Sequence, residues 1–423
     1  MTHTAEIISV GTELLLGNTT NTDARDISEM LSELGINVFY QTVVGDNDER
    51  LKSAVAIAKT RADIIITTGG LGPTYDDMTK QTLAACFGKK LFLNELEAEK
   101  IRQYFITRMH TAEMTENNLQ QAMLPEDCTI FSNACGTAPG CAFEADGIHV
   151  LMLPGPPSEC VSMFRNCAMP YLRSMSDAEI VSHKIHIFGR GESAIEALLR
   201  PLMVELENPT LAPYAKEGEV MLRLTAKAKT EAEAEALMAP VLKRVTDALG
   251  DIVYGVDTES LEKTVLKLMT EKRLTLATAE SCTGGLVSKR ITDIPGSSAI
   301  FLGGAVTYAN EAKTSAVGVP AELIAKFGAV SRECAVSMAE GARRSFCSDL
   351  AVSVTGIAGP ANDSVCKDVG LVYVALATGK ETFCRRLHIG DNRSRVRTVA
   401  ASHALDMIRR YLTGLPVTGE WEC

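Results

Sequence analysis

A serine and a cysteine stand side by side in residues 278–285, which read TAESCTGG. The apolar residues 274–277 precede this stretch and have the pattern of a buried strand. When a strand ends at a serine or a cysteine and glycines open the following helix, the side chain of that residue lies beside backbone N–H groups that have no helical partner. Acyl transfer requires this arrangement, because the N–H groups stabilise the oxyanion that forms when the nucleophile attacks. We therefore expect Ser281 or Cys282 to be a nucleophile.

The candidate partners of this nucleophile are Tyr308 and Lys313, at the two ends of the stretch YANEAK, where a strand turns into a helix. A lysine can act as the general base of a serine when burial lowers its pKa, and a tyrosine can relay or orient the proton. His388 and His403 are alternative partners, although neither lies in an obvious motif. A lone serine in a turn is far more often a helix cap than a nucleophile, so the spacing alone does not decide the matter.

A second stretch that could carry chemistry lies in the N-terminal third, at residues 67–77, which read TTGGLGPTYDD. Its three glycines permit backbone conformations that other residues resist, and they let backbone N–H groups approach an anion closely. Asp76 and Asp77 stand near the start of the next helix, where an acidic side chain can cap N–H groups or hold a divalent cation. The loop at residues 10–15, VGTELL, also follows a predicted strand. Both loops therefore fall at carboxyl ends of strands, where parallel sheets bind ligands.

The elements that position these loops alternate between strand and helix. We predict strands at residues 5–10, 36–44 and 63–67, and helices at 21–34, at 49–60 and from about 78. This alternation indicates β-α-β units, and hence an α/β domain with a doubly wound, mostly parallel sheet and helices on both faces. We assign residues 1–173 to this domain.

Residues 174–257 have the pattern of a small α+β domain. We predict strands at 182–188, 220–229 and 251–253, and helices at 231–249 and at 192–206, the latter interrupted at Pro201. Residues 182–257 hold nine Lys or Arg against twelve Asp or Glu and no Gly-x-x-Gly loop, so we do not expect them to bind RNA. The odd spacing of His183 and His186 points them to opposite faces of a strand, which argues against a metal pair. We expect this domain to be a spacer or a dimer-forming module.

Residues 258–423 have the pattern of an α/β domain with mixed strands. We predict helices at 261–272, 286–291, 332–346 and 395–411, and strands at 299–308, 350–355, 371–377 and 383–389. The last two strands are expected to pair as a hairpin. The polar residues of the domain concentrate at strand ends, where the serine of the opening stretch also lies.

The composition of the 423-residue chain limits the classes of function. A net charge of −11, 5% aromatic residues and a single tryptophan argue against a broad surface for nucleic acids or anionic membranes. No apolar run approaches the roughly 18 residues that cross a bilayer, and the start MTHTAE lacks the pattern of an export signal. The 12 cysteines form no Cys-x-x-Cys pair. We therefore expect a soluble, cytoplasmic protein with free thiols and without nucleic-acid or membrane partners.

Four N-terminal segments resemble the CinA (competence/damage-inducible protein A) family. They are residues 9–17, 68–77, 136–140 and 153–159, which read SVGTELLLG, TGGLGPTYDD, GTAPG and LPGPPSE. The N-terminal domain of that family is similar to the molybdopterin-binding domain of molybdenum-cofactor enzymes. The resemblance implies a pocket for a nucleotide or a pterin diphosphate, and a metal-dependent activity that hydrolyses ADP-ribose. The expected nucleotide-binding residues are Gly11, Thr12, Glu13, Gly69, Gly70, Gly72 and Thr74, and the expected ligands of a divalent metal ion are Asp76 and Asp77.

Four C-terminal segments resemble the C-terminal domain of the same family. They are residues 279–285, 304–313, 355–360 and 370–375, which read AESCTGG, GAVTYANEAK, TGIAGP and GLVYVA. In its active members that domain is a nicotinamide-mononucleotide amidohydrolase, which implies Ser281 as nucleophile, Lys313 as base and Tyr308 as helper, without a cofactor. The expected substrate-binding residues are Cys282, Thr283, Gly284, Gly285, Thr355, Gly356 and Gly359, with at least one of Arg393, Arg395 and Arg397. The resemblance also implies a KH-like fold for the middle domain.

The chain departs from the family pattern in two places. Residues 361–366 read ANDSVC where the family has a glycine-rich loop, and residues 390–397, GDNRSRVR, carry one extra residue, so the choice among the three arginines stays open. Two other classes of function also stay open, namely a non-enzymatic partner protein in DNA uptake or damage responses and a pterin-binding protein. The expected small-molecule partners are nicotinamide mononucleotide and ADP-ribose, and a homodimer is expected by analogy.

Overall fold

The structure, a computed structural model, describes residues 3–108, 115–175, 178–216, 218–360 and 367–418. The chain divides into two units, Met1–Val181 with Lys227–Ala234, and Ser182–Ala226 with Glu235–Cys423. The loop at residues 361–366, where the sequence departs from the family pattern, lies outside the described residues.

Six strands form the N-terminal sheet, in the order β2-β1-β3-β8-β7-β6. β2, β1, β3 and β8 run parallel, whereas β7 and β6 run antiparallel to their neighbours. The predicted mostly parallel sheet is therefore confirmed. The strands are β1 (Thr4–Val10), β2 (Asn37–Val44), β3 (Ile64–Thr68), β6 (Thr129–Phe131), β7 (Gly140–Ala145) and β8 (Ile148–Leu153).

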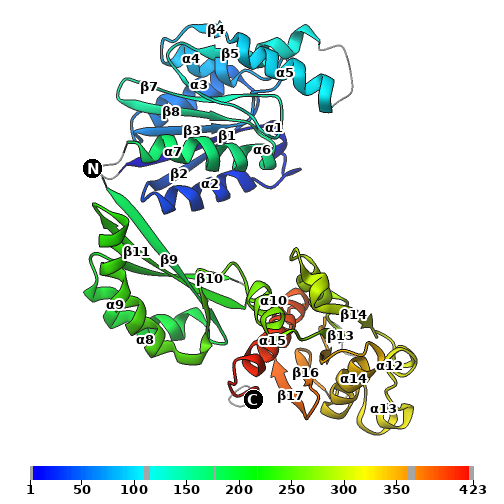
Figure 1. The fold of residues 1–423 in the computed structure, drawn as a ribbon. Coiled ribbons are helices and arrows are strands. Elements are labelled where there is room, and N and C mark those ends of the chain that lie inside the picture. Colours follow the sequence, from blue (N-terminus) through cyan, green and yellow to red (C-terminus); the bar gives the residue numbers. More distant parts are fainter. Residues whose placement is uncertain (1–2, 109–114, 176–177, 217, 361–366, 419–423) are drawn as a thin grey trace. The chain divides into compact units, whose positions relative to one another are not determined.

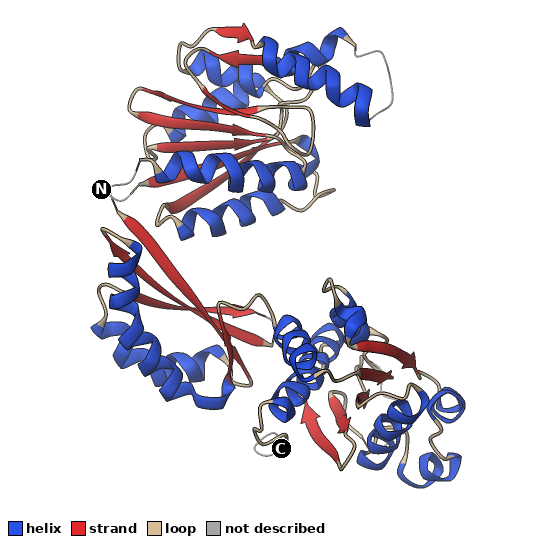
Figure 2. Ribbon diagram, viewed as in Figure 1, coloured by secondary structure: helices blue, strands red, loops and turns tan. Residues whose placement is uncertain are grey.

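Helices cover both faces of this sheet (Figures 1 and 2). α2 (Thr22–Glu33) and α6 (Pro157–Met163) contribute to the core on one face, and α3 (Asp48–Ala58) and α4 (Thr79–Cys86) contribute to the core on the other. β3 is buried along its whole length, because it lies between these two layers. This burial explains its continuous apolar start, whose three isoleucines alternate between the two cores.

Several further elements complete the N-terminal unit. β4 and β5 pair antiparallel in a separate two-stranded sheet. The Asn21 side chain accepts a hydrogen bond from Ala24 N, which caps α2 where the loop after β1 ends. The remaining elements are α1 (Thr12–Leu15), β4 (Leu91–Leu93), α5 (Glu95–Arg108), the 3₁₀ helix η1 (Glu116–Ala122), β5 (Met123–Pro125), the π-helix η2 (Phe164–Ala168) and α7 (Met169–Arg173).

The middle segment forms a four-stranded sheet in the order β10-β11-β9-β12, with two helices. Two details of the prediction are wrong. Pro201 lies inside a continuous helix α8, because buried side chains on the same helix hold it in place, and residues 250–252 form a 3₁₀ turn, so the last strand begins at Val253. The elements are β9 (Glu179–Phe188), α8 (Glu192–Glu205), β10 (Thr210–Lys216), β11 (Glu219–Ala228), α9 (Glu231–Leu249), η3 (Gly250–Ile252) and β12 (Val253–Val256).

The two histidines of β9 contact different partners. His183 lies within hydrogen-bonding distance of Asp257 and Glu235, with Nδ1–Oδ2 and Nε2–Oε2 distances of 2.6 and 2.9 Å. His186 packs its ring on Tyr254 and meets the Tyr254 hydroxyl at 3.3 Å. The prediction that these histidines do not form a metal pair agrees with this arrangement.

The C-terminal sheet has five strands in the order β14-β13-β15-β16-β17. β14, β13 and β15 are parallel, and β16 and β17 add the predicted antiparallel hairpin. Three parallel strands therefore place their carboxyl ends at one edge, where the serine stretch follows β13. The strands are β13 (Leu276–Glu280), β14 (Phe301–Val306), β15 (Leu350–Gly356), β16 (Leu371–Ala377) and β17 (Thr382–His388).

Helices again cover both faces of this sheet. α10, α11 and α15 contribute to the larger core, and α12 and α14 contribute to a smaller core on the other side, with α13 packed against it. α15 is longer at its start than predicted, because Asn392 caps it by accepting from Arg395 N. The helices are α10 (Leu261–Lys272), α11 (Leu286–Thr292), η4 (Ser297–Ala299), α12 (Asn310–Val317), α13 (Ala321–Phe327), α14 (Arg332–Ser345) and α15 (Arg393–Leu412).

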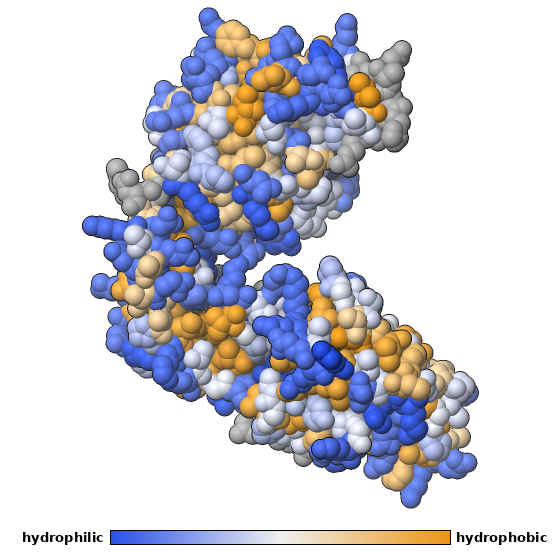
Figure 3. All heavy atoms as spheres, in the orientation of Figure 1, coloured by the Kyte–Doolittle hydropathy of each residue, from blue (hydrophilic) through white to orange (hydrophobic). Residues whose placement is uncertain are grey.

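The surface is largely polar on the face shown in Figure 3, where hydrophilic residues are interspersed with smaller apolar patches. Among the described residues, no helix combines the length and the apolar composition that crossing a bilayer would require.

Candidate active site

Ser281 follows β13 directly and is held by the neighbouring strand. Its N–H donates to the carbonyl oxygen of Val354 at 2.9 Å, and its own carbonyl oxygen accepts from Gly284 N at 3.0 Å. Gly284 and Gly285 have φ angles of 60° and 93°, in the left-handed region that favours glycine. The chain thereby reverses within a few residues and enters α11, which leaves the Ser281 side chain at the edge of the sheet.

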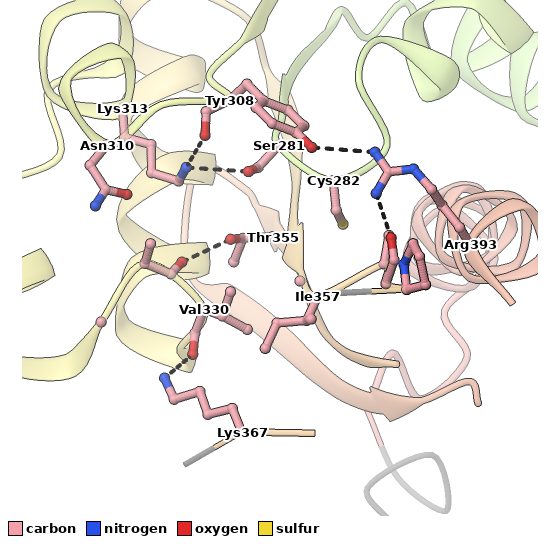
Figure 4. A pocket seen from close by; sticks show the side chains of 16 residues that line it. Ser281, Cys282, Tyr308, Asn310, Lys313, Val330, Thr355, Ile357, Lys367 and Arg393 are labelled. Atoms are coloured by element: carbon pink, nitrogen blue, oxygen red, sulfur yellow. Dashed lines mark hydrogen bonds between the residues drawn. The ribbon is translucent and has the colours of Figure 1, made fainter. Parts of the chain in front are cut away.

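Lys313 is the direct partner of Ser281. Its Nζ lies 3.2 Å from Ser281 Oγ and 3.3 Å from the carbonyl oxygen of Tyr308 (Figure 4). It also lies 2.9 Å from the carbonyl oxygen of Thr307. The side chain is 1% exposed, and burial lowers the pKa of the amine below its ordinary value. In the neutral amine, two N–H groups can donate to the two carbonyls, which directs the lone pair at the Ser281 hydroxyl.

Cys282 is a poor nucleophile in this setting. It is 5% exposed, and burial raises the pKa of its thiol to about 12. Since the thiolate is the reactive form of cysteine, the residue is neutral and weakly nucleophilic at neutral pH. The geometry therefore favours Ser281 over its neighbour.

The histidine alternatives do not reach the serine. His403 is buried, contacts Arg385 Nη1 at 3.1 Å, and has a pKa that burial lowers to about 3. His388 ends β17. Neither residue lines the cavity that contains Ser281, so the Ser281–Lys313 pair is the better supported arrangement.

The pair opens into a cavity of about 720 Å³. Besides the base Lys313, two of its lining residues are cationic, Lys367 and Arg393, and none of the lining residues in the described part of the chain is Asp or Glu. In a chain with a net charge of −11, this carboxylate-free wall favours an anionic ligand. The lining residues are Ser281, Cys282, Tyr308, Asn310, Lys313, Gly328, Ala329, Val330, Thr355, Gly356, Ile357, Ala358, Gly359, Pro360, Lys367 and Arg393.

The structure separates the three candidate arginines. Arg393 lines the cavity and donates to the carbonyl oxygen of Gly359 at 2.8 Å and to the Tyr308 hydroxyl at 3.3 Å (Figure 4). Arg397 donates to the carbonyl oxygen of Thr283 at 2.9 Å and so braces the serine turn. Arg395 lines a different cavity, so its expected contact with the substrate is not supported.

Tyr308 has two separate contacts. Its backbone carbonyl oxygen accepts from Lys313 Nζ, while its hydroxyl meets Arg393 and its side chain is otherwise exposed. The predicted role of the side chain as a proton relay to Ser281 therefore has no contact to support it. The tyrosine orients the lysine through its main chain and the arginine through its hydroxyl.

The remaining predicted residues divide into two groups. Thr355, Gly356 and Gly359 line the cavity, as expected. The other group, Thr283, Gly284 and Gly285, does not line it. The N–H groups of Gly284 and Leu286 donate to carbonyl oxygens of the same turn, and Thr283 is fully buried. Of residues 282–285 only Cys282 lines the cavity, so its N–H group is the candidate oxyanion donor.

The glycine loop of the N-terminal unit brings two strand ends together. Gly69 and Gly70 have φ angles of 90° and 66°. A Cβ atom on Gly69 would lie 2.2 Å from the carbonyl oxygen of Val10, and one on Gly70 would lie 2.1 Å from Thr79 Oγ1. A Cβ atom on Gly155 would lie 3.3 Å from Gly69 Cα. Three of the loops singled out in the sequence therefore meet at this edge of the sheet.

Asp76 and Asp77 converge on one threonine. Thr74 Oγ1 lies 2.5 Å from both Asp76 Oδ1 and Asp77 Oδ2, which compete for its single hydrogen, and Thr74 N donates to Asp77 Oδ2 at 2.8 Å. No side chain caps α4, which excludes the capping role for either aspartate. The described residues contain no group of three or more His, Cys, Asp or Glu side chains that could hold a metal. Two carboxylates suit Mg²⁺, which also takes water and substrate phosphate as ligands.

The loop after β1 is held by a residue that the sequence reasoning missed. Thr12 donates to Asp46 Oδ2 from both its N–H and its hydroxyl, each at 2.8 Å. The Glu13 carboxylate lies against Gly11, where a Cβ atom would be 2.5 Å from its Oε1. Asp46 could have been found, because it follows the parallel strand β2 at the same sheet edge as the other loops.

A second missed residue supports the glycine loop. Gln120, on η1, donates from Nε2 to the carbonyl oxygens of Thr74 and Gly72, at 2.9 and 3.3 Å. These bonds hold the loop through its carbonyl groups. No sequence signal marked this glutamine, because the contact joins segments that lie far apart in the chain.

The relatives of the chain match nearly its whole length. A "CinA-like protein" of Desulfovibrio desulfuricans is 48% identical over 423 residues, covering 99% of this chain and 98% of that protein. A "CinA-like protein" of Kosmotoga olearia is 46% identical over 411 residues, covering 97% and 99%. This chain belongs to the CinA family.

Three family models divide this CinA-family chain among them. The model described as "Probable molybdopterin binding domain" matches residues 6–174, that of the "Damage-inducible protein CinA KH domain" matches residues 182–255, and that of the "CinA C-terminal domain" matches residues 258–412. The three-domain architecture, with a molybdopterin-binding-like N-terminal domain and a KH-like middle domain, is therefore confirmed.

Solved structures of CinA proteins resemble parts of the chain. The competence/damage-inducible protein of Agrobacterium tumefaciens is 41% identical, covering 36% of this chain and 93% of its own, with a TM-score of 0.35. The CinA protein of Thermoplasma acidophilum is 34% identical, covering 40% of this chain and 97% of its own, with a TM-score of 0.36.

Proposed function

We propose that this CinA-family chain is an amidohydrolase that converts nicotinamide mononucleotide to nicotinate mononucleotide and ammonia. The observation that carries the proposal is the contact between Lys313 Nζ and Ser281 Oγ inside a cavity with cationic but no acidic lining residues in its described part. A serine with a buried, neutral lysine is suited to acyl transfer, and the cationic wall suits a substrate that carries a phosphate.

The reaction begins with proton transfer from Ser281 to the neutral amine of Lys313. Ser281 Oγ attacks the carboxamide carbon, and the backbone N–H group of Cys282 donates to the oxyanion. The Lys313 ammonium then returns the proton to the leaving nitrogen, so that ammonia departs and an ester on Ser281 remains. Water, deprotonated by the same amine, cleaves this ester and releases the carboxylate.

Arg393 is the residue we assign to the substrate phosphate. Its guanidinium is held by Gly359 O and the Tyr308 hydroxyl, which are neutral acceptors, so its positive charge is not compensated by these contacts. A guanidinium forms forked, charge-assisted bonds with phosphate oxygens. The substrate would then lie with its phosphate at Arg393 and its carboxamide at Ser281.

Product analysis tests this function. The purified chain is incubated with nicotinamide mononucleotide, and ammonia and nicotinate mononucleotide are measured separately. We expect equal amounts of the two products. If neither forms, or if free nicotinamide appears through cleavage of the glycosidic bond, the proposed reaction is wrong.

A second activity is proposed for the N-terminal domain, namely hydrolysis of ADP-ribose to AMP and ribose 5-phosphate. The meeting of the glycine loop with Asp76 and Asp77 favours it, because glycine N–H groups suit a diphosphate. Asp76 and Asp77 would hold a divalent cation, which when bound supplies polarisation of a phosphoryl oxygen and activation of water. Thr74 would orient the two carboxylates through its hydroxyl.

Measurement of AMP release with added Mg²⁺ or Mn²⁺ and with a chelator tests this second activity. We expect release only with the metal, and loss of release in Asp77→Asn. If ADP-ribose stays intact under all conditions while a pterin diphosphate binds, the domain is a pterin-binding module instead.

A further inference from the structure

Glu280 is a buried carboxylate that directly precedes the nucleophile. It is 1% exposed and ends β13. Its carboxylate accepts from Val287 N at 3.0 Å, from Ser288 N at 2.8 Å and from Ser288 Oγ at 2.7 Å. Burying a carboxylate is costly unless donors surround it, and these three donors all come from the first turn of α11. The carboxylate therefore fastens α11 to the end of the strand that carries Ser281.

The backbone of the same residue fastens the lysine. The Glu280 carbonyl oxygen accepts from Thr307 N at 2.7 Å. The Thr307 carbonyl oxygen in turn accepts from Lys313 Nζ at 2.9 Å. One residue thus connects three parts of the site, namely the serine, the turn that follows it, and the carbonyl that orients the base.

The turn between Ser281 and α11 has few other constraints. Residues 282–285 lie between Ser281 and α11, and two of them are glycines in the left-handed conformation. Arg397 holds this turn through Thr283 O, and Glu280 holds the helix into which the turn runs. Without the carboxylate, the first turn of α11 would lose three hydrogen bonds at once, and the turn that carries Ser281 Oγ and the Cys282 N–H group would no longer be fixed.

We propose that Glu280 is a positioning residue of the amidohydrolase site, whose carboxylate fixes the turn that carries the nucleophile Ser281 and the N–H group of Cys282. This inference rests on the function proposed above for Ser281. Glu280 does not line the cavity, so its removal changes the chemical step and leaves substrate binding nearly intact. Misplacement of reacting groups by about 1 Å costs on the order of 10²-fold in rate.

The test compares Glu280→Gln with the wild type and with Val265→Ala. The glutamine keeps the size of the side chain, but its amide has only one acceptor oxygen for the two backbone N–H groups, and its NH2 group cannot accept a hydrogen bond. Val265 is a buried residue of α10 in the same core and outside the site, so its truncation controls for a general loss of stability. For each protein we measure kcat and KM for nicotinamide mononucleotide, and the rate at which a fluorophosphonate probe labels Ser281. Labelling forms an Oγ–P bond and releases fluoride, while Lys313 takes the proton.

For Glu280→Gln we expect kcat and the labelling rate both to fall by roughly 10²-fold, with KM nearly unchanged and with Val265→Ala close to the wild type. If Glu280→Gln performs like Val265→Ala in both measurements, the proposal is overturned. If the wild type is labelled but releases no ammonia, the proposed function fails while the labelling rates still decide the role of Glu280. If the wild type is neither labelled nor active, both proposals fall.

A second variant covers the case in which Glu280→Gln does not fold. Ser288→Ala removes one of the three donors and leaves the two backbone N–H bonds in place. We expect it to slow labelling by roughly 10-fold, as expected for the loss of one hydrogen bond to a charged group. A labelling rate equal to that of the wild type would overturn the proposal.

Discussion

Cys282 is adjacent to Ser281, but burial makes the cysteine a weak nucleophile. Because the pKa of the Cys282 thiol is raised to about 12, almost no thiolate exists at neutral pH. We therefore expect Cys282→Ala to release ammonia from nicotinamide mononucleotide at close to the wild-type rate, and iodoacetamide at neutral pH not to inactivate the enzyme. A loss of turnover as deep as that of Ser281→Ala, in a folded Cys282→Ala protein, would instead make the cysteine the nucleophile.

The base gives the reaction a defined dependence on pH. Lys313 must be neutral to accept a proton, and burial lowers its pKa below the ordinary lysine value. We therefore expect kcat/KM to rise with pH through the lowered pKa and to fall as the amine becomes protonated at lower pH. Lys313→Ala should reduce kcat by roughly 10²- to 10⁴-fold, the range of general-base contributions, and should remove this limb of the profile. The measurement is kcat/KM across the pH range in which both proteins stay folded.

If kcat/KM of Lys313→Ala still rises with pH as it does in the wild type, a group other than Lys313 is responsible for that rise. Lys313→Met serves as the matched control, since it keeps most of the volume of the buried side chain but cannot accept a proton. Equal losses of kcat in the alanine and methionine variants would show that the missing base, and not the cavity that the alanine creates, lowers the rate.

The period of helix α15 places its arginines on different faces of the helix. Arg393 and Arg397 are four residues apart and share a face that reaches the site, whereas Arg395 lies between them and lines another cavity. We expect Arg393→Ala to raise KM for nicotinamide mononucleotide by roughly 10-fold or more, since a hydrogen bond to a charged group contributes about 1.5–3 kcal/mol. Arg395→Ala is the matched control and should leave KM unchanged.

The same variants can be compared on nicotinamide riboside, which lacks the phosphate. If Arg393 binds the phosphate, Arg393→Ala and the wild type should differ much less on the riboside than on the mononucleotide. An equal loss on both substrates would mean that the arginine shapes the cavity instead.

The elements that carry the site were largely predictable, and the contacts between them were not. Apolar periodicity placed the strand before Ser281 and the helix after it, and the motif around Lys313 indicated the base. Glu280 gave no signal of its own, because its role depends on N–H groups of a helix that folds back onto the strand end. The choice among the arginines needed the observed start of α15 at Arg393, which a short polar cap sets and which periodicity locates only to within a few residues.

Two fold details show the same limit. β10 was not predicted, because its sequence TLAPYAK contains a proline and lacks strict alternation, and an edge strand tolerates both. Pro201 was expected to interrupt its helix, but the buried residues of α8 on either side keep the helix continuous. In both places tertiary packing outweighs the local preference of the sequence.

For the whole molecule, the two candidate sites lie in separate units of the chain. They share no described residue, so we expect the two proposed activities to be lost independently. Asp77→Asn should remove AMP release from ADP-ribose and leave ammonia release unchanged, and Ser281→Ala should have the opposite effect. Both activities are measured on the full-length variants. Loss of both activities in one folded variant would contradict two separate sites.

The rate of ammonia release from nicotinamide mononucleotide in folded Ser281→Ala decides whether Ser281 is the nucleophile of an amidohydrolase. Removing a nucleophile leaves only the contributions of binding and of the oxyanion donor, so we predict a kcat at least roughly 10³-fold below that of the wild type. A Ser281→Ala protein that released ammonia at a rate near that of the wild type would contradict this account.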